Sequence, residues 1–338
     1  MSASPTTPEA VARERWLDRF TRDEIDSLRA MEDWRSWLSI GLDWALVALS
    51  MAAVAAWPNP LTILLAVFVI GARQLGMAIL MHEASHRTLF SDRRLNDWAG
   101  NWLCAYPVWG DLHPYRGYHL QHHAKTGTSE DPDLGLAAPF PVTRSSLRRK
   151  VWRDLSGQTG VKRAIATLRR DLGASRGRVR RDDAGIGSLQ GVVITNVVLL
   201  ALCAAFGHPL LYLLWPAAWL TTYSLAMRIR SIAEHGMVPD PLDDLRNTRT
   251  TLASWWERLL IAPNRVNFHL EHHLLMTVPH YHLPRMHRML RERGLLEGSP
   301  VAHGYAEVLR LASSRPEGAP GARQAGPTET ALTQRPPF

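Results

Sequence analysis

The chain has 338 residues and a formal net charge of +8, with 46% hydrophobic and 21% charged residues. Its two cysteines, Cys104 and Cys203, exclude a disulfide framework, a four-cysteine zinc site and an iron–sulfur cluster with four cysteine ligands. The basic excess alone is compatible with binding to nucleic acid, to an anionic membrane surface or to an acidic partner protein. The positions of the basic and apolar segments along the chain are needed to choose between these partners.

The first segments are polar. Residues 1–12 are small and polar and are predicted to be disordered. Residues 13–35 mix charged side chains with Trp16, Leu28 and Trp34, which is typical of an amphipathic helix. We expect this helix to lie along a bilayer surface. A helix packed on the protein itself is the alternative that the same pattern allows.

Four apolar segments follow and form two pairs, each pair joined by a very short link. The first two segments carry one charged residue each, Asp43 and Arg73, and each is long enough to cross about 30 Å of hydrocarbon as a helix. The second pair is shorter and also predominantly apolar. We therefore predict an all-α membrane protein with two transmembrane hairpins, whose four spans are residues 36–57, 61–81, 191–207 and 209–227.

The distribution of positive charge orients these hairpins. The links at 58–60 and 207–209 contain no Lys or Arg, whereas segment 111–188 contains 15. By the positive-inside rule, that segment and both chain ends are cytoplasmic. The membrane domain is expected to cover residues 36–312, and the Pro-, Gly- and Thr-rich residues 313–338 are predicted to be a disordered tail.

Two charged features need an interpretation. An ionisable residue inside a span is a functional candidate, and Arg73 can hold a substrate head group or pair with Asp43. Snorkelling, or burial against a backbone carbonyl, is the interpretation we favour. The basic stretch 144–181 lies in a cytoplasmic loop, so we expect it to meet anionic lipid, an acidic electron donor or an acyl carrier rather than nucleic acid.

Nine of the 15 histidines fall into four groups that directly follow the predicted spans or lie between them. The groups are HEASH with His82 and His86, HLQHH with His119, His122 and His123, AEHG with His235, and HLEHH with His269, His272 and His273. On a helix, residues i, i+3 and i+4 fan over about 100°, so each group presents its imidazoles from one face. With the topology above, all four groups meet at the cytoplasmic membrane face.

Such a number of imidazoles predicts a metal centre. HEASH alone also fits a zinc peptidase, with Glu83 as general base, but three ligands would then leave most clustered histidines without a role. Two metals with four or five imidazoles each use all nine, although imidazole suits iron, copper, nickel and zinc alike. The remaining histidines are expected to be packing, surface or supporting residues: His113, His208, His280, His282, His287 and His303.

Acidic residues stand beside these groups. Ligating imidazoles usually donate their second N–H to a carboxylate or a carbonyl. The candidates for this supporting role are Glu83, Glu234, Glu271, Asp131 and Asp133, and the alternative for each is a solvated acid or a helix cap.

At these residues the sequence resembles the integral-membrane fatty acid desaturase family. That family has H-x-x-x-H, H-x-x-H-H and H-x-x-H-H in the same order, and its flanks resemble PYRGYHLQHHAKTGTSEDPDLG, RSIAEHG and VPHYHLPRMH in this chain. The resemblance covers roughly residues 40–300. It implies a non-haem di-iron centre held by the nine histidines, and an attack on an unactivated C–H bond that consumes O2 and electrons.

The resemblance makes a fatty acyl desaturase the expected function. Relatives on the same scaffold hydroxylate, make alkynes or decarboxylate a fatty acid to a terminal alkene, and the histidine groups do not separate these outcomes. Because no fused haem or iron–sulfur domain is recognisable, electrons are expected from a separate protein of the ferredoxin or cytochrome b5 type. A membrane zinc peptidase and a non-enzymatic membrane adaptor that binds no stoichiometric metal are the other classes to test.

Overall fold

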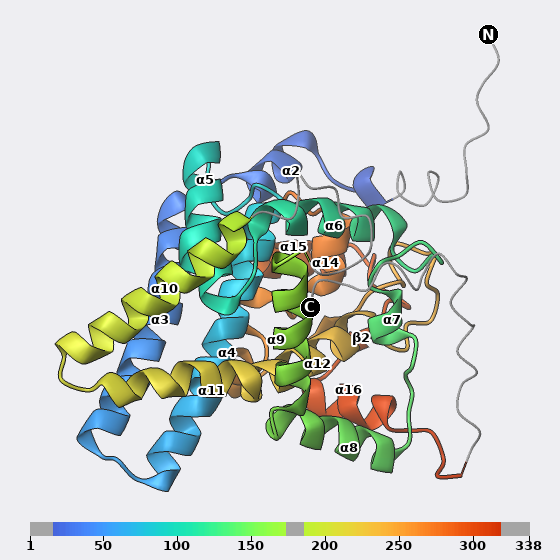
Figure 1. The fold of residues 1–338 in the computed structure, drawn as a ribbon. Coiled ribbons are helices and arrows are strands. Elements are labelled where there is room, and N and C mark those ends of the chain that lie inside the picture. Colours follow the sequence, from blue (N-terminus) through green and yellow to red (C-terminus); the bar gives the residue numbers. More distant parts are fainter. Residues whose placement is uncertain (1–15, 174–185, 319–338) are drawn as a thin grey trace.

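The computed structural model describes residues 16–173 and 186–318. Within those ranges the chain is mostly helical, as predicted, and its only sheet is one short pair of strands (Figure 1). The disorder predicted for residues 1–12, and for the tail beyond residue 318, lies outside the described residues.

The first predicted hairpin is present as two long helices, α3 (Asp33–Ala56) and α4 (Pro60–Ser85). The turn is short because α4 is capped at once. The Asn59 side chain accepts the backbone N–H groups of Leu61 and Thr62 at 3.0 and 3.1 Å, and Pro60 occupies the first helical position. A capping side chain satisfies N–H groups that a helix start leaves unpaired, and proline has no N–H to satisfy there.

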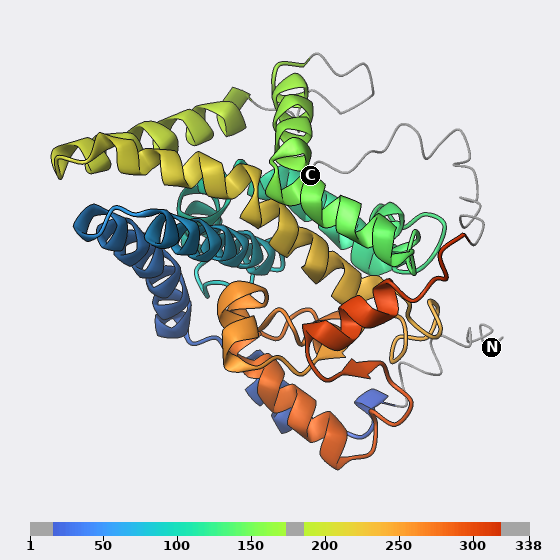
Figure 2. The ribbon, with the colours of Figure 1, turned by 90° about the horizontal axis from the view of Figure 1, so that it is seen from below.

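The second hairpin pairs α10 (Ile186–Ala205) with a broken helix. Its returning arm consists of the 3₁₀ turn η3 (Pro209–Leu213), α11 (Leu214–Leu220) and α12 (Thr222–His235). The two hairpin turns lie on the same side of the molecule in both views, at the left of Figures 1 and 2. Helix α12 packs closely on α4, because a Cβ atom at Gly71 would overlap Thr222 and the backbone of Tyr223.

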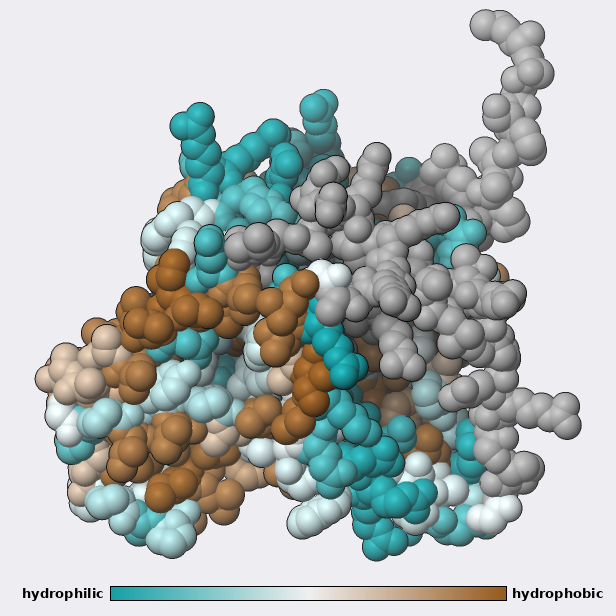
Figure 3. All heavy atoms as spheres, in the orientation of Figure 1, coloured by the Kyte–Doolittle hydropathy of each residue, from teal (hydrophilic) through white to brown (hydrophobic). Residues whose placement is uncertain are grey.

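Three stretches of the described chain are long and apolar enough to cross a membrane: Arg22–Ala56, Pro60–Ser85 and Pro209–His235. The apolar helix Leu189–Ala205, at the third predicted span, is shorter, so the count of four spans stays a prediction. Apolar side chains cover the outside of these hairpins, and they gather over α10 and α11 in Figure 3. Among the exposed ones are Leu38, Leu42, Leu49, Leu61, Leu64, Leu65, Val193, Val197, Val198 and Leu202.

The remaining described elements lie outside the two hairpins. They are α2 (Arg22–Arg29), α5 (Arg93–Ala99), the π-helix η1 (Gly100–Ala105), η2 (Tyr106–Val108), α6 (Leu112–Lys125), α7 (Leu134–Ala137), α8 (Arg144–Leu155), α9 (Gln158–Asp171), α13 (Trp255–Leu260), η4 (Pro263–Arg265), α14 (His269–Leu274), η5 (His280–His282), α15 (Leu283–Glu292) and α16 (Tyr305–Ala312). The strands β1 (Thr250–Thr251) and β2 (Val301–Ala302) pair in parallel and join the segment before α13 to the segment before α16.

The predicted helix at residues 13–35 is interrupted, since α2 ends at Arg29 and α3 begins at Asp33. Trp16 and Leu28 are buried in an apolar cluster with residues of α14 and α15. Protein therefore covers Trp16 and Leu28, whereas Trp34 is exposed, and contact of the segment with a bilayer surface stays a prediction.

Arg73 is buried against a backbone carbonyl, as the favoured interpretation predicts, and it also pairs with Asp43. Its Nη1 donates to Asp43 Oδ1 at 3.0 Å, and its Nη2 donates to the carbonyl of Leu259. Asn264 Nδ2 donates to the other Asp43 oxygen at 2.9 Å. Arg73 and Asp43 are almost fully buried, and this network joins α3 and α4 to α13 and η4.

Candidate metal centre

The nine histidines lie on four helices, and their side chains meet in one region of the structure. His82 and His86 occupy the last turn of α4, and His235 ends α12. The second box lies on α6, whose start is fixed by Asp111 accepting the N–H of His113 at 3.1 Å. The third box forms most of α14. The structure therefore brings together all nine histidines that the sequence predicts as ligands.

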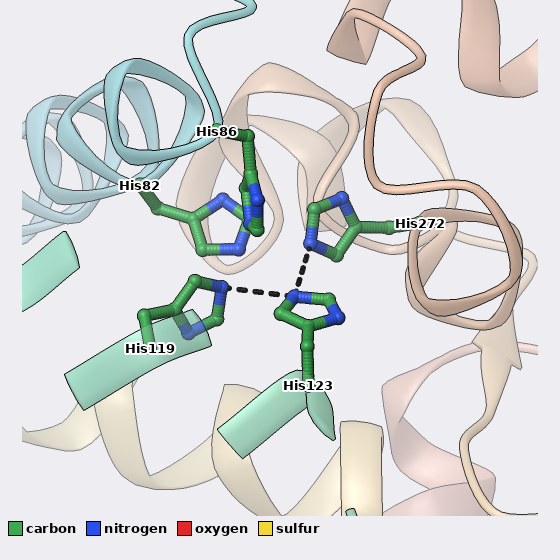
Figure 4. Close-up of side chains that lie close together, drawn as sticks. All are labelled: His82, His86, His119, His123 and His272. Atoms are coloured by element: carbon green, nitrogen blue, oxygen red, sulfur yellow. Dashed lines mark hydrogen bonds between the residues drawn. The ribbon is translucent and has the colours of Figure 1, made fainter. Parts of the chain in front are cut away.

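The imidazoles divide into two groups. In each group the nearest ring nitrogens all lie within 4.8 Å of one another. Figure 4 shows the first group, whose side chains converge from three sides on one point. The first group is His82, His86, His119, His123 and His272, and the second is His122, His235, His269 and His273.

The positions of the imidazole nitrogens are better explained by coordination to a metal ion than by hydrogen bonds between the rings. His123 Nε2 lies 3.0 Å from the Nε2 atoms of both His119 and His272, and His235 Nε2 lies 2.8 Å from His269 Nε2. Both ring nitrogens of His82 and of His86 are buried without any hydrogen-bond partner among the described residues. Buried polar atoms normally have partners, and a cation at the centre of each group would supply one.

The electrostatics favour the ligating form of these rings. The pKa values of five of these histidines lie well below the usual range, because the rings are buried and, as the second cause, because other imidazoles surround them. The five are His119, His123, His269, His272 and His273. These rings are therefore neutral at physiological pH, and a neutral ring is the form that binds a metal.

His122 differs from its neighbours. Burial is the largest single effect and opposes the charged form of the ring. The hydrogen bond to Asp131, together with the charges of Asp133, Asp131 and Glu234, outweighs burial and raises the pKa of His122. Asp131 Oδ1 lies 2.7 Å from His122 Nδ1, and this carboxylate also accepts the backbone N–H groups of Gly127 and Asp133. An anionic acceptor at Nδ1 leaves Nε2 for the second group, which is the outer support that ligating histidines usually have.

Two other predicted acids lie beside the centre. Glu83 Oε1 is 3.6 Å from His82 Nδ1, and Glu234 Oε1 is 3.6 Å from His269 Nδ1. Glu234 also pairs with Arg230 at 2.5 Å. Asp133 accepts a hydrogen bond from the Tyr118 hydroxyl.

The fifth predicted acid, Glu271, supports the site indirectly. Glu271 lies 2.6 Å from His287 Nδ1 and accepts from Thr250 Oγ1 at 2.6 Å, so it joins α14 to α15 and β1. His280 provides a similar link, since its backbone N–H donates to Glu83 at 3.0 Å. Both histidines belong to the VPHYHLPRMH segment and are buried, and the sequence alone did not separate them from surface residues.

A cavity of about 440 Å³ reaches the centre from the side of α9 and α12. His119, His122, His235 and His269 form part of its wall. Tyr115 and Tyr118 of α6 complete that side of the cavity. A molecule in this cavity would therefore lie against ligands of both groups.

The sequence matches the fatty acid desaturase family over residues 55–305, a range that includes all four histidine groups, and the chain belongs to that family. It is 28% identical over 266 residues to dihydrorhizobitoxine desaturase of Bradyrhizobium elkanii, which covers 74% of this chain and 73% of that protein. It is 22% identical over 301 residues to sn-1 oleoyl-lipid 12-desaturase of Arthrospira platensis, which covers 83% of each chain.

Membership in this family makes the chain an oxidoreductase of the desaturase type and disfavours the zinc peptidase. The geometry agrees, because His82 and His86 are joined by three further imidazoles rather than by one. A catalytic zinc needs an open position beside three protein ligands.

Proposed function

We propose that this chain is a membrane fatty acyl desaturase that uses O2 and two iron ions. The observation that carries the proposal is the division of nine converging imidazoles into a group of five and a group of four. When bound, the two ions would supply the oxidising power that removes hydrogen from an unactivated carbon chain. The first group would hold one ion and the second group the other.

The overall reaction balances with an external reductant. A –CH2–CH2– unit loses two hydrogens and becomes –CH=CH–, while O2, two further electrons and two protons give two molecules of water. The electrons would come from a separate donor protein of the ferredoxin or cytochrome b5 type.

The chain's own residues place the substrate and keep the ligands in position. Asp131 orients His122, and Glu83 and Glu234 lie beside His82 and His269. The cavity holds the reacting carbons next to both groups and limits access of water. Of the two named relatives, one acts on an oleoyl lipid, which supports an acyl chain as the substrate here.

We also propose the topology of two hairpins with four spans. The four histidine groups and both chain ends would lie on the cytoplasmic side. The shared side of the two turns and the exposed apolar side chains support this arrangement. The basic helices α8 and α9 would then face the anionic cytoplasmic leaflet.

The test is mass spectrometry of total lipids from cells that express the chain, compared with cells that express His122→Ala. We expect an acyl species lighter by two hydrogens that is absent from the variant, and purified protein with two iron ions per chain. A species heavier by one oxygen would indicate a hydroxylase, and a hydrocarbon without the carboxyl carbon a decarboxylase. Unchanged lipids with iron bound would point away from acyl chains toward another substrate. Protein without stoichiometric metal that tolerates His→Ala at all nine positions would refute the enzyme and favour an adaptor.

A further inference from the structure

The cavity has two chemically different sides. The histidines of the metal centre line one part of it, and residues of α9 and of α12 before His235 line another. Four cations line the cavity on these two helices: Lys162, Arg163, Arg228 and Arg230. Two carboxylates, Asp133 and Glu234, also line it. An acyl chain by itself gives no reason for such a concentration of positive charge.

Two of the four cations are neutralised within the protein. Arg228 makes two hydrogen bonds to Asp154, at 2.5 and 2.8 Å, and Arg230 pairs with Glu234 at 2.5 Å. Among the described residues, no carboxylate lies within ion-pair distance of Lys162 or Arg163. The cavity therefore has a net positive site on α9.

Arg163 is held rigidly at this site. Its Nη2 donates to the carbonyl of Trp219 at 2.7 Å, and its guanidinium lies 4.2 Å from the Trp219 ring centre and 4.7 Å from the Tyr223 ring centre. The break between α11 and α12 at Thr221 leaves that carbonyl free to accept. Arg163 Nε is buried and has no hydrogen-bond partner among the described residues.

A fixed guanidinium with an unused donor is costly unless an acceptor arrives. Arginine presents its N–H groups as a fork that matches the oxygens of a carboxylate or a phosphate. Lys162, one position earlier on the exposed side of α9, adds a flexible second charge. An anionic ligand group would satisfy both residues at once.

We propose that Arg163 and Lys162 bind the anionic group of the substrate, a carboxylate or a phosphate, while its carbon chain runs toward the histidines. Apolar residues also line the cavity, among them Ala78, Met81, Leu136 and Met227. The position of the carbon chain rests on the proposed function, whereas binding of the anion does not require turnover. The anion fixes one end of the substrate and so determines which carbons face the metal centre.

The test is calorimetric titration of the purified full-length protein, in zwitterionic nanodiscs, with three probes. Dodecanoate carries a carboxylate, dodecyl phosphate carries a phosphate, and methyl dodecanoate carries no charge. We expect wild-type protein to bind at least one anionic probe more tightly than the ester. Arg163→Gln should weaken that binding about 10- to 100-fold and leave the ester unchanged, because it removes charge-assisted hydrogen bonds.

Arg169→Gln is the matched control, since Arg169 is an exposed arginine of the same helix that does not line the cavity. Lys162→Gln should weaken the same anionic probe by a smaller factor. The preferred probe identifies the source of the anion, a free acid or a phosphate-bearing lipid. The proposal is overturned if wild-type protein binds the ester as tightly as both anions, or if Arg163→Gln and Arg169→Gln behave alike. Selective anion binding without any desaturated lipid would instead refute the proposed reaction and leave the anion site standing.

Discussion

Replacing Asp131 by Asn tests the link between the outer carboxylates and the metal centre. The variant keeps the shape of the side chain and an acceptor for one of the two backbone N–H groups that the carboxylate binds, but it removes the anionic acceptor 2.7 Å from His122 Nδ1. Both side chains are at least 95% buried, so water screens this contact little. A hydrogen bond to a charged group contributes about 1.5–3 kcal/mol, which corresponds to roughly a 10- to 150-fold change in affinity.

The loss of affinity should affect only one of the two metal ions. His122 belongs to the group of four, which would then depend on three well-oriented imidazoles, whereas the group of five is unaffected. After dialysis against a graded chelator, elemental analysis should find close to one metal ion per chain in Asp131→Asn under conditions where wild-type protein keeps two. Glu130→Gln is the control, because Glu130 is an exposed neighbour that pairs with Lys125. Equal metal content in Asp131→Asn and wild type would refute the reasoning, as would loss of both ions together without unfolding.

Three further predictions follow from the contacts. Arg73→Met should lower the free energy of unfolding by about 3–5 kcal/mol, because it leaves Asp43 buried without its cation. Chemical denaturation should show that the double variant with Asp43→Leu recovers part of this loss. Absence of any recovery would contradict a stabilising interaction between Arg73 and Asp43. Gly71→Ala should destabilise the protein by roughly 1–3 kcal/mol, because the new Cβ would overlap α12. Gly41→Ala is the control: its Cβ would meet no atom within 4 Å, so it should be neutral or stabilising in the same assay. The raised pKa of His122 lets a proton compete for this ring at a higher pH than for the rings whose pKa is lowered. On acidification from about pH 8 the group of four should therefore release its metal before the group of five, and simultaneous release in a metal titration would argue against this reasoning.

The helical hairpins could be predicted because their signals are local. The proline and asparagine between the two long apolar runs mark the first turn, and the structure places α3 and α4 on either side of them. The break in the second hairpin has a different origin. Residues 209–227 read as one continuous span, yet the helix stops at Leu220 and restarts at Thr222. A Cβ at Gly160 of α9 would overlap the backbone of Leu220, so a tertiary contact that no local pattern reveals accompanies the break.

The candidate site shows the same division. The histidines could be found from spacing, because an i, i+3, i+4 set is a property of one helix. The roles of His280 and His287 could not be found, because each depends on a partner from a distant turn: Glu83 for the first and Glu271 for the second. The cavity is likewise formed by α6, α9 and α12, which meet only in the folded chain.

Helix geometry also explains why the ligands divide five to four. On an α-helix, residue i+4 lies about 40° from residue i, whereas residue i+3 lies about 60° away on the opposite side. An H-x-x-H-H box on one helix therefore gives its first and last histidines to one group and its middle histidine to the other. The structure follows this rule twice and in opposite senses: His119 and His123 join the first group while His122 joins the second, and in the third box His272 alone joins the first group. Two such boxes supply three imidazoles to each group, and the other segments account for the difference between five and four. The H-x-x-x-H pair at the end of α4 adds two to the first group and the single histidine of α12 adds one to the second.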